Sequence, residues 1–270
     1  MKTNNLLFGI LFVFITCYSY SQQTVRNIDS LIVILNETPA DTSKVNLYRK
    51  IAGHYNVAYL DSAKAFAEKG IVLAKQLNYT DGHWENLNVL GNYYERKTDY
   101  EGALKNYNTA LALVETVNSI KGIAVVKNNI ATIYIRKGEY QKAIPLLFEA
   151  LKAEEVLKNE NGIAQAYNNI GVVYYYMQDF DKTTDYLKRA LVIQESLGNY
   201  DGLINGYNNV GAIHIHQEKY KEAIKDYEKA LSISTEIDDK VNQAIELSNI
   251  GICWTKLRDF VKAEKFYNRS

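Results

Sequence analysis

The residues that could carry metal or acid–base chemistry are few in this chain of 270 residues. It has four histidines, and only His214 and His216 lie close together in sequence. On a helix, two residues separated by two positions project about 200° apart, so these rings cannot bind one ion from the same face. A packed ring is therefore a better interpretation of His214 than a zinc ligand. We expect no metal site and no cofactor.

Motifs typical of catalysis are also missing from the sequence. It contains no GxxxxGK phosphate loop, no nucleophile elbow and no paired cysteine motif. Cys253 falls in an apolar column of a predicted helix, where a small buried hydrophobe is the simplest interpretation. We expect no catalytic residue and a chain that is not an enzyme. An enzyme would require a catalytic domain after Ser270.

The charge balance bears on the choice of partner. The chain has 31 basic and 31 acidic residues, which gives a formal net charge of zero at pH 7. Nucleic acids and anionic membranes attract surfaces with a clear excess of Lys and Arg. The sequence therefore favours neither nucleic acid nor an anionic membrane as a partner.

Residues 1–21 have the features of a cleavable export signal. Lys2 provides a positive start, an apolar run extends over 6–15, and small residues flank Tyr20, which makes Gln22 the expected new N-terminus. The run is too short for a comfortable membrane span, so we expect no membrane insertion after cleavage. A lipoprotein signal would use Cys17, but residues 14–16 fit its recognition motif poorly. These features predict export to the periplasm or the outer face of the envelope, with Cys253 as the only remaining cysteine and no internal disulfide.

The sequence repeats with a period of forty residues, and a period of this size is typical of a stacked repeat array. Six repeats start at residues 41, 81, 121, 161, 201 and 241, and the sixth is incomplete. Three columns illustrate the pattern: Gly91, Ala131, Gly171, Gly211 and Gly251; Tyr100, Tyr140, Phe180, Tyr220 and Phe260; Tyr107, Leu147, Leu187, Tyr227 and Tyr267.

Spacings of three, four and seven residues within each repeat predict two helices. The first is expected from about the third to the sixteenth position, and the second to start at an aromatic residue. Acidic residues precede the second helix and are expected to cap it: Asp99, Glu139, Asp179 and Asp259. Pro145 lies near the start of a second helix, where it costs nothing in the first turn and one hydrogen bond if it lies deeper.

The repeats resemble the tetratricopeptide repeat, in its longer variant. The resemblance rests on Ile170, Gly171 and Tyr174 in a first helix and on Tyr220, Ala223, Tyr227 and Ala230 in a second. It covers 41–270 and implies an all-α, right-handed superhelical solenoid of antiparallel helix pairs. Residues 22–40 are expected to add an N-terminal capping helix. The entry into the array also resembles the exported sensory repeat region of bacterial signalling proteins.

In this family the first helices line a concave face, and one stripe of each first helix is not needed for packing. This stripe predicts a peptide-binding surface with a ladder of amides, a mildly basic edge and one tyrosine: Asn129, Asn169, Asn209 and Asn249; Arg96, Arg136 and Lys256; Tyr176. Amides suit a peptide backbone, and the basic edge suits an acidic side chain or a free C-terminal carboxylate. Alternatively, the ladder bonds to neighbouring helices and is structural.

Two functions remain open from the sequence. The first is a protein- or peptide-binding module that forms the periplasmic sensory part of a signal-transduction protein. The second is a stand-alone scaffold for an envelope protein complex. The chain stops at Ser270 within its sixth repeat, so we expect it to be the front part of a longer protein. A membrane helix soon after the array would favour the sensor, and a polar capping helix followed by a stop would favour the scaffold.

Overall fold

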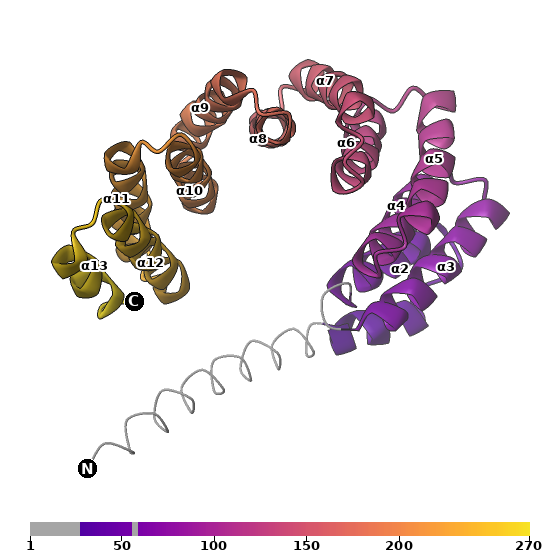
Figure 1. Cartoon of the computed structure of the whole chain (residues 1–270). Coiled ribbons are helices and arrows are strands. Elements are labelled where there is room, and N and C mark those ends of the chain that lie inside the picture. Colours follow the sequence, from indigo (N-terminus) through magenta and orange to yellow (C-terminus); the bar gives the residue numbers. More distant parts are fainter. Residues whose placement is uncertain (1–27, 56–58) are drawn as a thin grey trace, which may run out of the picture. The chain divides into compact units, whose positions relative to one another are not determined.

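A computed structural model describes residues 28–55 and 59–270 (Figure 1). The predicted export signal lies outside these residues. Residues 28–37, within the predicted capping segment, are helical. The chain divides into two compact units, Met1–Val126 and Lys127–Ser270.

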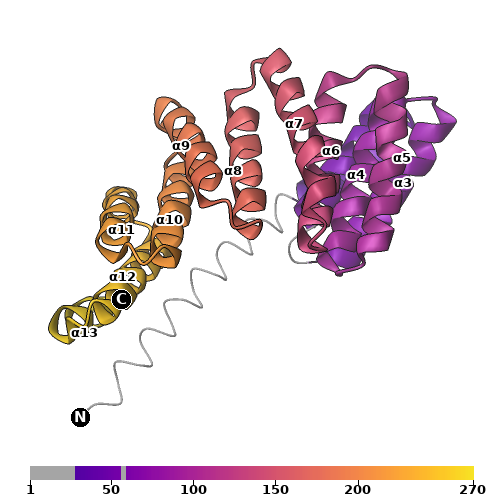
Figure 2. The ribbon, with the colours of Figure 1, turned by 45° about the horizontal axis from the view of Figure 1, so that its top comes forward.

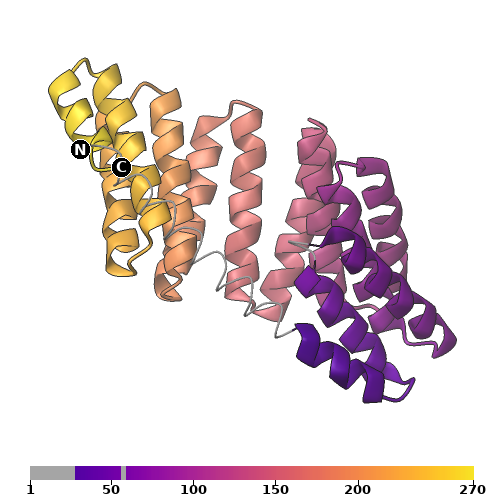
Figure 3. The same ribbon diagram turned by 90° about the horizontal axis from the view of Figure 1, so that it is seen from below.

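Each compact unit is a series of helices connected by short turns, and successive helices pack side by side (Figures 2 and 3). The first compact unit contains α2 (Thr42–Tyr55), α3 (Leu60–Gln76), α4 (Thr80–Arg96) and α5 (Tyr100–Thr116). The helix α6 (Ile120–Arg136) crosses the division. The second contains α7 (Tyr140–Leu157), α8 (Glu160–Tyr176), α9 (Phe180–Ser196), α10 (Tyr200–His216), α11 (Tyr220–Glu236), α12 (Lys240–Lys256) and α13 (Phe260–Tyr267). The fold is thus the predicted all-α solenoid of helix pairs.

The forty-residue period has a simple backbone origin. Most helices contain 17 residues, and three-residue turns follow them. Each turn contains one residue with positive φ, and these residues recur every twenty positions: Asn78, Thr98, Asn118, Gly138, Lys158, Gln178, Gly198, Glu218, Asp238 and Arg258. A left-handed residue after the last helical turn is a common way to end a helix. Two helices with their turns therefore make one repeat.

The predicted helix starts are confirmed for the second helices and wrong for the first. Every second helix from α5 to α13 begins at the aromatic column. First helices begin about three residues earlier than expected, as α12 does at Lys240 rather than near Gln243. In α12 a capping residue accompanies this early start: the Asp239 carboxylate accepts hydrogen bonds from the backbone N–H groups of Val241 and Asn242, both at 3.1 Å. The residues before α4 and α8 make no side-chain cap, so capping does not explain the early start of every first helix.

Three of the four predicted acidic caps form. Asp99, Asp179 and Asp259 accept hydrogen bonds from backbone N–H groups three residues further on, at 2.8 Å, 3.1 Å and 3.1 Å. Glu139 makes no such bond. Its carboxylate instead contacts the Lys142 Nζ at 2.6 Å, and this ion pair lowers the pKa of Glu139. The additional methylene of Glu thus directs its carboxylate to a side chain rather than to the backbone.

Pro145 lies deeper than the first turn. It is the sixth residue of α7, so the backbone loses the hydrogen bond that this position would donate to the carbonyl oxygen of Gln141. The hydrogen bond donated two residues earlier, from the Ala143 N to the Glu139 O, is 3.3 Å long, whereas its counterpart from Thr183 to Asp179 is 3.0 Å. Of the two alternatives, the structure shows the one that costs a hydrogen bond.

The small-residue column allows the two helices of a pair to approach closely. A methyl group at Gly91 would overlap the ring of Tyr107, which is fully buried. Where the facing residue is leucine, the column tolerates alanine, as in the buried pair Ala131 and Leu147. The predicted role of this column in close helix packing is confirmed.

Candidate peptide-binding surface

The predicted surface residues lie on the first helices of successive repeats. Arg96 ends α4 in the first compact unit. The other seven lie in the second compact unit, on α6, α8, α10 and α12: Asn129, Arg136, Asn169, Tyr176, Asn209, Asn249 and Lys256. Their environments differ. Some of these side chains bond to other residues of the chain, whereas others are exposed and could contact a ligand.

Asn169 is a structural contact. Its Nδ2 donates a hydrogen bond of 2.7 Å to the Oδ1 of Asn128, one repeat earlier on α6. This bond links α8 to α6, which is the alternative interpretation of the ladder. Asn129 and Arg136 also interact with other residues. These members of the predicted site are engaged within the chain.

Asn209 is different. Its side chain is exposed on α10 and makes no hydrogen bond within the part of the chain that the structure describes. The inter-helix contact is made instead by its neighbour Asn208, whose Nδ2 donates to the Oε1 of Glu246 at 3.0 Å. The consecutive asparagines therefore divide the two tasks, and Asn209 retains a free donor and a free acceptor.

Tyr176 is half exposed, with 52% of its surface accessible, although one face of its ring is covered. It stacks on Tyr140 with ring centroids 5.4 Å apart and planes 3° apart. In the next repeat, His216 stacks on Phe180 at 5.8 Å. Sequence reasoning missed this stacking of the last residue of a first helix on the first residue of the preceding second helix. The signal that could have predicted it was the presence of an aromatic residue or His both at the end of a first helix and at the start of the preceding second helix.

The two neighbouring histidines lie in separate environments, as the helical spacing predicts. His214 is not simply a packed ring, because its Nδ1 lies 2.6 Å from the Oδ2 of Asp226. Burial raises the pKa of Asp226, and the hydrogen bond with His214 opposes this shift. No cluster of His, Cys, Asp or Glu that could hold a metal ion occurs among the described residues.

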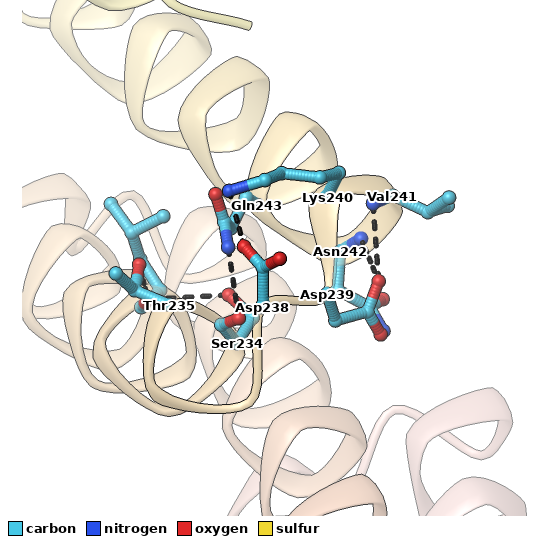
Figure 4. Close-up of polar contacts among 9 residues, drawn as sticks. Ser234, Thr235, Asp238, Asp239, Lys240, Val241, Asn242 and Gln243 are labelled. Atoms are coloured by element: carbon cyan, nitrogen blue, oxygen red, sulfur yellow. Dashed lines mark hydrogen bonds and ion pairs between the residues drawn. The ribbon is translucent and has the colours of Figure 1, made fainter. Parts of the chain in front are cut away.

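One carboxylate on α12 is buried between helices and is not part of the exposed surface. Glu246 on α12 is fully buried and accepts hydrogen bonds from Asn208 on α10 and, at 2.9 Å, from Ser234 on α11. Burial raises its pKa. Figure 4 shows the adjoining turn, where the Gln243 Nε2 also donates to the backbone oxygen of Ser234 at 2.9 Å. This network connects three helices rather than presenting an acid to a ligand.

Cys253 is fully buried, as predicted. Burial raises the pKa of its thiol to about 11, so the thiolate that would react is not formed near neutral pH.

None of the helices in the described ranges has an apolar stretch long enough to cross a membrane. The surface thus offers amides, an exposed aromatic ring and a lysine, which suit binding rather than covalent chemistry.

Comparisons with solved structures agree with this fold. BtubC from P. vanneervenii is similar with a TM-score of 0.68 and 21% identity, over 81% of this chain and 91% of that one. A STAND protein with a tetratricopeptide repeat sensor from Pyrococcus horikoshii gives 0.74 and 17%, over 90% of this chain but only 39% of that one. A Rap protein complexed with Competence and Sporulation Factor gives 0.65 and 15%, over 84% and 78%. At these identities the likeness shows the fold alone.

The sequence itself identifies the family. A search of curated protein sequences gave no significant match. A profile of the tetratricopeptide repeat matches residues 84–155, 122–196 and 202–270. Because these matches together span well over half of the chain, it belongs to the tetratricopeptide repeat family.

Proposed function

We propose that this chain is a non-enzymatic module that binds a peptide or a protein segment along its first helices. The observation that carries the proposal is the exposed amide of Asn209, which has no hydrogen-bonding partner within the described residues. Tyr176, at the end of the preceding first helix, adds an exposed aromatic surface. An amide donor and acceptor with a nearby ring suits the backbone and one side chain of an extended peptide.

The peptide contacts in this proposal are centred on α8 and α10. Asn169 contributes by positioning α8, because its amide is bonded to Asn128. Arg96, which lies in the first compact unit, and Arg136, which interacts with other residues of the chain, are not part of this site. Asn249 and Lys256 lie on α12, whose exposed face has a different composition.

Two solved relatives of the fold support a binding role. The repeat region of the Pyrococcus horikoshii protein is described as a sensor, and the Rap protein was solved with Competence and Sporulation Factor. Helical repeat arrays in general bind through the extended surface that stacking creates. We therefore propose the sensory part of a signal-transduction protein rather than a scaffold for an envelope complex.

Export to the periplasm is part of this proposal and rests on the sequence of residues 1–21. Cell fractionation followed by N-terminal mass spectrometry tests it. A periplasmic protein that begins at Gln22 is the expected result. An uncleaved protein that stays in the cytoplasm would contradict the proposed location.

Binding is tested by selecting ligands for the full chain from a synthetic library of random peptides with free carboxyl ends. We expect Asn209→Ala to weaken the selected peptide about tenfold, because one or two hydrogen bonds are lost, with an unchanged melting temperature. Asn169→Ala should lower the melting temperature instead, since it breaks the contact with Asn128.

Asn108→Ala is a matched control, because Asn108 is an exposed asparagine on a second helix. It should change neither affinity nor stability. If the peptide binds Asn209→Ala as tightly as the unchanged chain, the proposed site is wrong.

A further inference from the structure

The exposed side of α12 differs from that of the other first helices. It carries Val241, Ile245 and Ile252, which are 71%, 46% and 41% exposed. The corresponding positions of α4, α6, α8 and α10 are mostly polar: Asp81, Lys121, Asn161 and Asp201; Glu85, Val125, Gln165 and Asn205; Asn92, Thr132, Val172 and Ala212. The apolar residues of α12 are therefore not explained by the packing that the repeats share.

These residues form one face. At 100° per residue, Val241, Ile245, Asn249, Ile252 and Lys256 project within about 80° of one another around the helix axis. We call these five residues the α12 face. Figure 4 shows that the Val241 side chain at its start points away from Ser234 and Gln243. The face is apolar at three positions, with an amide near its middle and a lysine at its end.

The polar members of the α12 face have no partner among the described residues. Lys256 makes no ion pair there, and Asn249 makes no hydrogen bond there. Exposed isoleucine and valine side chains gain free energy when another apolar surface covers them. The α12 face therefore has the composition of a contact surface, with apolar residues on both sides of an amide and polar positions that a partner can satisfy.

We propose that the α12 face binds the same face of a second copy of this chain, with the two α12 helices antiparallel across a two-fold axis. The spacing of the residues carries this choice of occupant. In an antiparallel pair centred between residues 248 and 249, Ile245 faces Ile252 of the second copy, and Val241 faces its Lys256. Each apolar residue of the centre then meets an apolar residue, as a two-fold interface requires.

The polar residues fit the same axis. Asn249 lies beside the axis and meets its own counterpart, and an amide can both donate to and accept from an identical amide. The stem of Lys256 covers Val241 of the second copy, and its ammonium group lies near the Asp238 carboxylate at the start of that helix. Asp238 is exposed and contacts Lys240 on the same chain at 2.5 Å. A membrane surface fits less well, because Lys256 is the face's only basic residue.

This interface does not use Asn209 or Tyr176, so it stands independently of the proposed function. The first test is the mass of the full chain in solution, by sedimentation equilibrium. We expect a dimer, and Ile252→Asp should weaken self-association about 100-fold by burying a charge at the centre of the interface. Val192→Asp is the matched control, because Val192 is 67% exposed on α9, and it should leave the dimer intact. Circular dichroism should show the same helix content for all three proteins.

Cross-linking tests the two-fold geometry itself. In a Cys17→Ser background with the buried Cys253 retained, Asn249→Cys should form a disulfide-linked dimer under mild oxidation. Ile245→Cys and Ile252→Cys should link to each other when mixed and should each link weakly to themselves. This pattern is specific to an antiparallel pair centred near residue 249.

Three results would overturn the inference. The first is a monomeric chain at concentrations of about 100 µM, well above the dissociation constant of a stable dimer. The second is a dimer that Ile252→Asp leaves unchanged. The third is an Ile252→Asp variant that has the same mass in solution as the unchanged chain but no longer binds the selected peptide. That result would assign the α12 face to the peptide instead.

Discussion

At the scale of single residues, the polar groups between repeats decide which side chains are available to a ligand. Asn169 and Asn208 bond across repeats, whereas Asn209 remains exposed. Glu246 is the most unusual of these groups, because a fully buried carboxylate accepts only two hydrogen bonds. Its charge loses more solvation than these bonds restore, which is why its pKa is raised.

Glu246→Gln should therefore stabilise the protein near neutral pH. With a raised pKa, the folded state binds more protons than the unfolded state between the ordinary and the raised pKa of this carboxyl group. Stability conferred at this site thus falls as pH rises through that window. A neutral amide removes the penalty, and we expect a gain on the order of 1 kcal/mol at pH 7 that vanishes below the ordinary pKa.

Urea unfolding of both proteins over a range of pH values measures this difference. Glu228→Gln is the control, because Glu228 is exposed on the neighbouring helix and should show no such dependence. A Glu246→Gln variant that is less stable at pH 7 would show that the hydrogen bonds of the carboxylate outweigh its desolvation.

At the scale of helix pairs, the structure shows that one small residue sets how closely two helices approach. The small column faces either tyrosine or leucine in the second helix. Gly91 faces the buried ring of Tyr107, whereas a methyl group at Gly171 would lie 3.1 Å from the flexible Leu187. The chain itself contains the alternative pairing, with Ala131 and Leu147 both buried.

We expect Gly91→Ala to destabilise the chain by about 1–3 kcal/mol, because the buried ring cannot move aside. Gly171→Ala should be close to neutral, since the strain at Leu187 offsets a gain in helix propensity of about 1 kcal/mol. Thermal unfolding measures both effects.

The cost of Gly91→Ala should depend on whether the facing residue is tyrosine or leucine. In a Tyr107→Leu background, Gly91→Ala should lose most of its cost, because the pair then matches Ala131 and Leu147. A double-mutant cycle with no coupling between the two positions would show that the ring does not cause the effect.

At the scale of the whole chain, each helix of a compact unit packs mainly on its neighbours in sequence. Stability in such an array is close to a sum of local terms. A substitution in the last repeat should therefore lower the local stability of the helices near it and leave the stability of the first compact unit unchanged.

Ile250→Ala removes a fully buried side chain from α12, at a cost of about 2–5 kcal/mol. Hydrogen–deuterium exchange should increase in α12 and α13 while α2 to α5 keep their protection. Val192→Ala, at an exposed position of α9, is the control and should change neither region. Equal loss of protection along the entire chain would show that it unfolds as one cooperative body instead.

The sequence by itself determined the period, the two helices of each repeat, the aromatic start of the second helix and the small column between them. These features depend on local helix geometry and on packing that every repeat shares, so repetition makes them visible. It also indicated the caps at Asp99, Asp179 and Asp259, because capping is a local contact.

Only the tertiary structure decided which members of the asparagine ladder are free, that Tyr176 rests on Tyr140, and that Glu246 is buried. It also showed that the apolar residues of α12 remain exposed. Each of these outcomes depends on which atoms of two different repeats meet. The residue type and its column do not specify these contacts. Asparagine occupies the same column at both positions, yet Asn169 bonds to the preceding repeat whereas Asn209 stays free.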